Sequence, residues 1–154
     1  MAKKSGQGEP CPVARGAGII ADRWALLIVR DAFDGVTRFG DFQRGLGMAR
    51  NILADRLRML VEEGILASRP ASDGSAYQEY VLTEKGEDLF PVIVALRRWG
   101  ERHLFAPGEP HSVLAWRESG EAVEELALRT ADGREPAAAE TFVRKVAPGG
   151  SGAS

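Results

Sequence analysis

Residues 38–86, RFGDFQRGLGMARNILADRLRMLVEEGILASRPASDGSAYQEYVLTEKG, decide the fold of this 154-residue chain. The stretch RFGDFQRGL (38–46) predicts a short helix, and the glycine-containing turn GMA (47–49) separates it from a second helix over residues 50–64. Two strands follow, over 65–69 and 77–82, and the Asp73-Gly74 pair between them suits a tight turn. A helix that follows such a turn can enter the major groove of DNA, so this order predicts a winged helix-turn-helix.

The second of these helices has an apolar side and a polar side. Leu53, Leu57 and Leu60 lie at i, i+4 and i+7, which places them together toward a core. An ordinary solvated helix with surface arginines is the competing interpretation of this pattern. The polar side carries Arg50, Asn51, Ala54 and Arg58.

Positive charge is concentrated in this part of the chain. Residues 38–58 contain five arginines and two aspartates, a local net charge of +3, whereas the whole chain has a formal net charge of −2. Arginine suits guanine or a phosphate and asparagine suits adenine, so we expect Arg50 and Asn51 to read bases. The wing tip ASDGSA (71–76) has an aspartate and no Lys or Arg, so we expect only shallow contact from the wing. The expected phosphate contacts are Arg38, Arg44, Arg58 and, in the wing, Arg69.

Further helices are predicted on both sides of this unit. One runs from Pro12 to about residue 21, and the next is capped by Asp22 and ends at Asp34-Gly35. After the wing, Thr83 can cap a long helix over residues 84–104. Pro91 lies inside that helix and is expected to kink it or to cost a hydrogen bond. The apolar stripe of the long helix consists of Leu89, Val92, Ile93, Leu96, Trp99 and His103.

From Cys11 to Leu104 the chain resembles the HxlR-type family of bacterial winged-helix transcriptional regulators. The matching segments are CPV (11–13), DRWALLIVRDAFDG (22–35), RFGDFQRGL (38–46), NILADRLRMLVEEGIL (51–66), YQEYVLTEKG (77–86) and PVIVALRRWGERH (91–103). The resemblance implies a sequence-specific repressor or activator that binds double-stranded operator DNA as a homodimer. It also implies dimer contacts from the first and the long helix, and the long helix is apolar over more turns than a three-helix core needs. The expected interface residues are Ile19, Ile20, Leu89, Ile93, Leu96 and Trp99.

The recognition helix departs from the family's usual pattern. Ala49 stands where many members have a serine. The absence of that serine removes an N-cap that typically contributes about 1 kcal/mol. Ala54 and Asp55 stand where members often have threonine and glutamine. An aspartate there would repel phosphate, although it could accept a hydrogen bond from cytosine. The family's operator sequences therefore do not transfer to this chain.

Cys11 is the single cysteine, at a predicted helix start where the helix dipole stabilises a thiolate and Arg15 lies one turn later. HxlR-type proteins carry a cysteine at this position, and some use it to sense oxidants or electrophiles. The resemblance thus implies a redox-sensing role and an electrophile or other small-molecule effector; the alternative is a structural cysteine. With no second cysteine, only an intersubunit Cys11–Cys11 bond, a mixed disulfide or an adduct can form.

Composition divides the chain into four parts. Residues 1–10 and 148–154 are polar tails that we expect to be disordered, and 11–106 form the DNA-binding and dimerisation domain. Residues 107–147 are predicted to be β-rich, because SVLAWR, AVEELALRT and TFVRKV are strand-like, although AVEELALR also suits a helix. The predicted fold class is therefore α+β, a winged helix-turn-helix with a C-terminal dimerisation helix and a small β extension.

Several function classes are disfavoured by the sequence. No apolar run is long enough to span a bilayer and the N-terminus lacks the apolar core of a signal peptide, so we expect a cytoplasmic protein without membrane contact. No metal-ligand spacing, nucleotide-binding motif or catalytic motif is present, so we expect no metal, no cofactor and no enzymatic activity.

The leading hypothesis is a homodimeric transcriptional regulator whose two recognition helices enter successive major grooves of an inverted repeat. The second is a winged-helix module that binds another protein without reading DNA. The chain after residue 110 supports this alternative, because its five Lys/Arg against seven Asp/Glu make it acidic.

Overall fold

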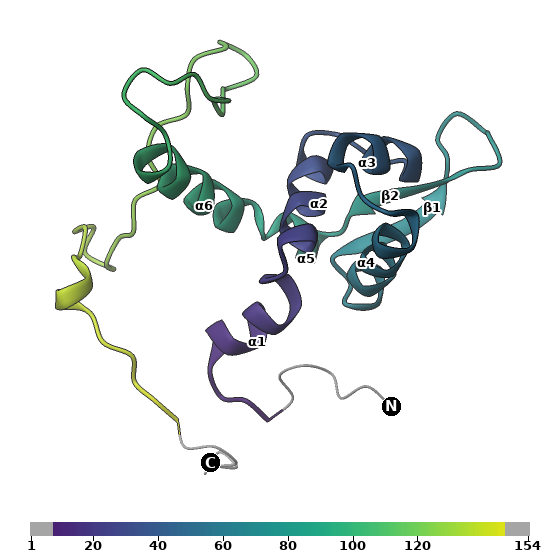
Figure 1. The fold of residues 1–154 in the computed structure, drawn as a ribbon. Coiled ribbons are helices and arrows are strands. Elements are labelled where there is room, and N and C mark those ends of the chain that lie inside the picture. Colours follow the sequence, from purple (N-terminus) through teal and green to yellow (C-terminus); the bar gives the residue numbers. More distant parts are fainter. Residues whose placement is uncertain (1–7, 147–154) are drawn as a thin grey trace. The chain divides into compact units, whose positions relative to one another are not determined.

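The structure, a computed structural model, describes residues 8–146 (Figure 1). Residues 1–7 of the expected tail at 1–10, and all of the expected tail at 148–154, therefore lie outside the described residues. The chain divides into two compact units. One contains the described residues up to Leu89 together with 144–146, and the other is Phe90–Val143. The division therefore falls at Leu89 and not at residue 106, where the sequence predicted it.

The first unit begins with two helices, α1 (Pro12–Ile20) and α2 (Arg23–Phe33). The carboxylate of Asp22 accepts a hydrogen bond from the backbone N–H of Trp24 at 3.4 Å, which confirms the predicted N-cap of α2. The residues of α2 that reach the core are Ala25, Ile28 and Val29.

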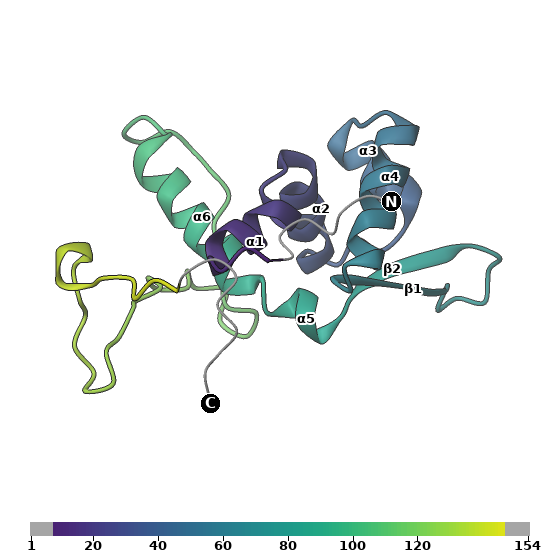
Figure 2. The ribbon, with the colours of Figure 1, turned by 90° about the horizontal axis from the view of Figure 1, so that it is seen from below.

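The helix-turn-helix consists of α3 (Phe39–Leu46) and α4 (Arg50–Glu62), which lie side by side in Figures 1 and 2. Gly47 ends α3 with φ at 63°, a left-handed conformation that favours glycine, and its N–H donates to the carbonyl of Gln43 at 2.9 Å. Leu53, Leu57 and Leu60 are all buried, as their spacing predicted.

The wing is an antiparallel pair, β1 (Leu66–Pro70) and β2 (Gln78–Leu82), with Leu66 opposite Leu82. A third segment joins its edge, because Arg38 bridges to Glu79 and the N–H of Tyr80 donates to the carbonyl of Thr37 at 2.7 Å. The residues just before α3 are therefore held against the wing. The winged helix-turn-helix expected from the sequence is present, with its core between α2, α4 and this sheet.

Two helices replace the single long helix predicted after the wing. They are α5 (Glu84–Glu87), which Thr83 caps by accepting from the N–H of Gly86 at 3.0 Å, and α6 (Phe90–His103). Pro91 therefore lies in the first turn of α6 and not inside a helix, so the predicted kink was wrong. Proline fits there because the N–H groups of a first turn have no partner within the helix.

The β-rich extension predicted for 107–147 does not form in the described residues. Between 104 and 146 the structure has one isolated bridge, Ala115 to Ala122, and a short 3-10 helix, η1 (Ala138–Glu140). AVEELALR is neither a strand nor a helix. The physical reason is that alternating sequences form strands where one face can be buried, and no residue from 104 to 146 is buried.

No helix within residues 8–146 has the length and apolar content that crossing a membrane requires.

Candidate nucleic-acid interface

The polar side of α4 is open to solvent as the sequence predicted. Arg50, Asn51 and Arg58 are exposed and Ala54 is half-buried. The helix starts after Ala49, which makes no side-chain capping hydrogen bond, so the N–H groups of the first turn remain available to an acceptor.

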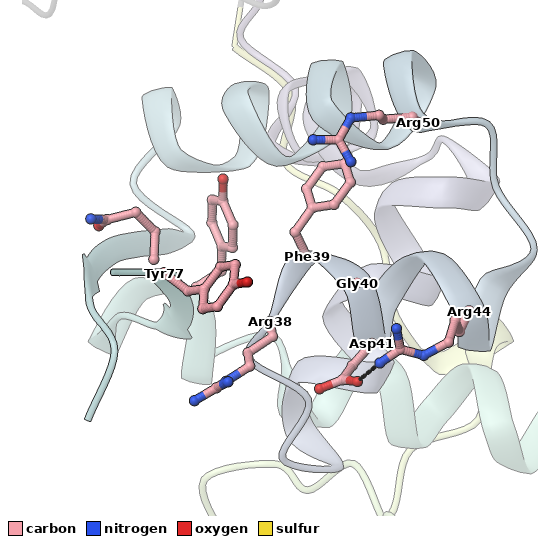
Figure 3. Close-up of a pocket in the computed structure, with 9 residues that line it drawn as sticks. Arg38, Phe39, Gly40, Asp41, Arg44, Arg50 and Tyr77 are labelled. Carbon is pink, nitrogen blue, oxygen red and sulfur yellow. Dashed lines mark hydrogen bonds and ion pairs between the residues drawn. The ribbon is translucent and has the colours of Figure 1, made fainter. Parts of the chain in front are cut away.

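Arg50 is held by an aromatic ring. Its guanidinium carbon lies 4.9 Å from the centre of the Phe39 ring, within cation–π distance, and Figure 3 shows the side chain reaching from α4 over that ring on α3. This contact orients the first arginine of the recognition helix in the free protein. It also couples the two helices of the motif through one side-chain pair.

A hollow of about 550 Å³ opens beside Arg50, between α3, the start of α4 and the wing (Figure 3). Three of the predicted DNA-binding arginines, Arg38, Arg44 and Arg50, line it together. Its remaining lining is Phe39, Gly40, Asp41, Tyr77, Gln78 and Tyr80. Guanidinium groups, phenol hydroxyls and an amide around one concave surface match the acceptors of a sugar-phosphate backbone.

The wing tip reaches back to this hollow through an ion pair. Asp73 accepts a hydrogen bond from Arg38 and another from the backbone N–H of Ser75, at 2.9 Å in the second case. The Ser75 bonds first, and then Arg38, hold the pKa of Asp73 well below its usual range, and Asp73 in turn raises the pKa of Arg38. In the free protein, Asp73 is therefore bound to Arg38, one of the arginines predicted to contact a phosphate.

The other predicted phosphate contacts also have carboxylate neighbours. Arg44 pairs with Asp41 on α3, and both side chains are exposed (Figure 3). Arg58 lies 3.9 Å from Asp55, also in the open. Exposed ion pairs of this kind contribute little to stability, so these arginines can exchange their carboxylate partners for another anion at a small cost in free energy.

Arg69 differs because its partner is buried. Its guanidinium lies 3.4 Å from the carboxylate of Glu79, whose side chain is only 6% exposed. Ser72 donates to the same carboxylate at 3.0 Å, and the hydrogen bonds from Ser72 are the main cause that lowers the pKa of Glu79. Arg69 therefore neutralises a buried charge in the wing, although more than half of its side chain remains exposed.

Sequence reasoning missed the aromatic part of this surface. Phe39 was expected only as part of the short helix over 38–46, and Tyr77 and Tyr80 only as part of the strand over 77–82. Tyr77 is 70% exposed and lines the hollow, and aromatic residues are enriched in binding interfaces. The signal in the sequence was a pair of tyrosines, Tyr77 and Tyr80, on either side of Gln78 and Glu79 and shortly after the turn at Gly74.

Cys11 is exposed and forms the N-cap of α1, where its sulfur accepts from the N–H of Ala14 at 3.5 Å. The Nε of Arg15 donates a hydrogen bond to the backbone carbonyl of Glu9. The carboxylate of Glu9 accepts from the N–H of Cys11 at 3.0 Å. The predicted position of Cys11 at a helix start is therefore confirmed.

The predicted dimer residues are distributed over both units. In the first unit Ile19, Ile20 and Leu89 are half-buried. In the second, Ile93 is half-buried, whereas Leu96 and Trp99 are 49% and 55% exposed. Within the part of the chain that the structure covers, no cluster of three or more His, Cys, Asp or Glu side chains is placed to hold a metal ion.

Family comparison matches residues 19–107 to the HxlR-like helix-turn-helix family. The HTH-type transcriptional regulator Rv3095 of Mycobacterium tuberculosis, itself uncharacterised, is 43% identical over 123 residues, which are 80% of this chain and 78% of Rv3095. The uncharacterised regulator YvaP of Bacillus subtilis is 30% identical over 95 residues, 60% of this chain and 88% of YvaP.

Solved structures are similar over different lengths. PA1607, a candidate transcription factor, has 54% identity and a TM-score of 0.85, covering 90% of this chain and 96% of PA1607. PA1374 from Pseudomonas aeruginosa, also a candidate transcription factor, has 38% identity and a TM-score of 0.61, covering 92% and 95%. The reduced form of the redox regulator HypR has 28% identity and a TM-score of 0.56, covering 61% and 94%. The first two thus match beyond the family segment, whereas HypR matches a length close to that segment.

Proposed function

The chain belongs to the HxlR-like helix-turn-helix family of transcriptional regulators, and we propose that it binds a specific DNA operator as a homodimer. The observation that carries this proposal is the juxtaposition of an exposed Arg50-Asn51 pair at the start of α4 with the arginine-lined hollow beside it. A recognition helix needs both features, because base edges give specificity and phosphates give position.

The roles of the side chains follow from their chemistry. Arg50, oriented by Phe39, reads a guanine, and Asn51 beside it reads an adenine. Ala54 offers its methyl group to the methyl group of a thymine. The phosphate contacts are Arg38, Arg44, Arg58 and Arg69.

Binding exchanges anions at several of these contacts. Arg38 and Arg44 are bound to aspartates in the free protein and must pass to phosphates on DNA. The exchange conserves the number of ion pairs, so the net gain comes mainly from counterions that leave the DNA. Affinity should therefore fall steeply with salt.

A twofold dimer gives this surface its geometry. We place the dimer contacts on α1, on α6 and on Leu89 just before α6, which would set the two α4 helices about one helical turn of DNA apart on an inverted repeat. The contact residues are Ile19, Ile20, Leu89, Ile93, Leu96 and Trp99. Replacing Leu96 with glutamate should give monomers that lose operator binding, and a variant that stays dimeric in light scattering would contradict this placement.

The decisive experiment compares two arginines of one helix on operator fragments selected from a genomic library. Arg50→Ala should weaken the best site by roughly 10- to 100-fold and relax the preference at one base pair. Arg58→Ala should weaken all sequences alike and reduce the slope of log affinity against log salt by about 0.9. If the wild-type protein shows no salt-sensitive sequence preference at all, the chain is a protein-interaction module and not an operator-binding regulator.

Cys11 is the proposed point of regulation, acting on oxidants or electrophiles. Its sulfur is exposed and has one long hydrogen bond, so a reagent can reach it. Modification at the start of α1 would alter the dimer contacts and so the distance between the two α4 helices. Operator affinity should fall after treatment with diamide or a quinone, and Cys11→Ser should bind normally and ignore the reagent. Equal wild-type affinity before and after stoichiometric modification would leave Cys11 a structural residue.

A further inference from the structure

The segment after α6 has no core of its own. From residue 104 to 146 none of the residues is buried and only Leu114, Val123, Thr130 and Pro136 are half-buried. In Figures 1 and 2 it continues as irregular backbone, interrupted only by η1. A chain that orders so many residues without burying them needs another surface to offset the lost conformational entropy.

This segment nevertheless carries large apolar side chains. Leu128 is 74% exposed, Phe142 is 83% exposed and Val143 is 77% exposed. The exposed fractions of these three side chains leave most of their apolar surface in water, which is a cost that burial against another surface would remove. The further exposed members of the second unit are Val92, Leu96, Trp99, Leu104, Phe105, Val113, Trp116 and Leu126.

One side of α6 holds the segment. Arg97 donates to the carbonyl and the hydroxyl of Ser112, at 3.1 and 2.8 Å. Arg98 donates to the carbonyl of Val123, and Arg102 pairs with Glu125 at 2.8 Å. These bonds tie backbone and polar groups of the segment to its own helix, while its exposed leucines and phenylalanine stay outside them.

The other side of α6 is apolar and open. Residues two apart on a helix point about 200° away from each other, so Leu96 lies opposite Arg98, and Trp99 opposite Arg97. Trp99 and His103, one turn apart, have ring centres 5.5 Å from each other, and both are exposed. The helix thus uses one side for its own extension and leaves the other for a different molecule.

We propose that residues 112–143 form an arm that packs on the second subunit of the homodimer. This inference rests on the homodimer proposed above and extends its contacts beyond the helices. The exposed apolar side chains of the second unit present on the order of 1,000 Å² per copy, given the usual size of such side chains, and a stable interface needs roughly 800 Å² per partner. The exposed apolar side chains of α6 by themselves present less area than such an interface needs, and those of the arm bring the total to about that area. Because both features belong to one unit, a twofold pairing lets each copy cover the other, as an isologous dimer requires.

The test places charge on the arm in the full chain. The variant Leu128→Asp with Phe142→Asp should weaken the dimer at least about 10-fold in sedimentation equilibrium, since each carboxylate would be desolvated in the interface. The control is Ala127→Asp with Ala139→Asp, which adds the same charge at neighbouring exposed positions of the arm. The control should dissociate as the wild type does. Both side chains of the test variant are exposed in the single chain, so the fold of the chain should not change, which circular dichroism checks.

A second measurement asks where the arm lies. A photoreactive benzoylphenylalanine at position 128, in a mixture of ¹⁵N-labelled and unlabelled protein, should give cross-linked peptides that carry one label from each copy. Cross-links only within one chain, a wild-type chain that stays monomeric, or equal dissociation of the two charged variants would each overturn the arm. Neither readout uses DNA, so the two proposals can fail separately. Cross-links between copies without any operator preference would count against the proposed function alone. Operator preference without cross-links between copies would count against the arm alone.

Discussion

Gly86 is the position where the smallest possible change should have the largest effect on the first unit. It lies in α5, buried against the start of the wing, and a Cβ placed there would be 2.1 Å from the carbonyl oxygen of Ile65. Real Cβ contacts are essentially never shorter than 3.0 Å, so a backbone group must move by about 1 Å. That same oxygen accepts the N–H of Thr83 at 3.1 Å, so moving it breaks the connection between α5 and the strand next to it.

The size of the effect follows from these two terms. Overpacking a core costs about 1–3 kcal/mol, and a buried hydrogen bond that is broken without replacement costs about 1–3 kcal/mol. Gly86→Ala should therefore lower the free energy of unfolding by on the order of 3 kcal/mol, and the Tm by about 12–24 °C for a unit of this size. Urea denaturation followed by circular dichroism measures the first, and a thermal scan measures the second.

Gly45→Ala is the matched control for this prediction. It makes the same substitution in a helix of the same unit, where the nearest atom to the new Cβ is the Asp31 carboxylate at an ordinary 3.8 Å. Alanine should there be neutral or raise stability by up to about 0.5–1 kcal/mol, because a helical glycine is more costly to order. If Gly86→Ala unfolds within about 1 kcal/mol of the wild type, α5 does not pack on the Ile65 carbonyl as described.

Asp73→Asn should raise DNA affinity, because Arg38 no longer has to leave a carboxylate to reach its phosphate, while the slope of log affinity against log salt should stay as in the wild type because the number of phosphate contacts is the same; a filter-binding titration at several salt concentrations that shows an unchanged affinity would reject this. Glu79→Gln should flatten the dependence of the free energy of unfolding on acid pH. The pKa of Glu79 is lowered in the folded chain, so its stabilising effect is complete above about pH 4.3, the usual glutamate pKa, and is lost as the pH falls through the lower pKa of the folded state. Wild type and variant should therefore converge in stability as acid denaturation proceeds. Leu53→Ala should cost about 2–5 kcal/mol in urea denaturation because the side chain is fully buried, and a loss below 1 kcal/mol would mean that α4 is not packed by this residue.

Local patterns in the sequence were sufficient for the DNA-reading unit. The spacing of Leu53, Leu57 and Leu60 predicted the buried side of α4, and the three residues proved buried. Gly47 and Asp22 predicted a helix end and a helix start, and both act there. These signals are reliable because they act within a few residues of the chain, where backbone conformation and burial periodicity decide the outcome.

Patterns failed where local propensity had no tertiary support. The alternating segments after residue 110 have the composition of strands, but a strand needs a face to bury, and residues 104–146 pair only at the Ala115–Ala122 bridge and have no buried face. The break between α5 and α6 was missed for a related reason. The stripe of apolar residues continues across the break, so periodicity gave no sign of it. Pro91 costs stability inside a helix but fits the first turn of one, which is where it lies in α6.

The sequence by itself determined the order of the elements and the buried side of α4, and it predicted which arginines are candidates for DNA contact, because composition and periodicity carry that information directly. Only the tertiary structure decided which of those arginines share one surface and what they touch. Arg38, Arg44 and Arg50 meet around one hollow because the turn at Gly47 folds α4 back on α3 and because Thr37 and Arg38 pair with the wing. The aspartate opposite Arg38 is 35 residues away in the chain, and the ring beneath Arg50 belongs to another helix. Contacts of that range depend on how the chain packs, and packing is a property of the whole unit and not of any segment.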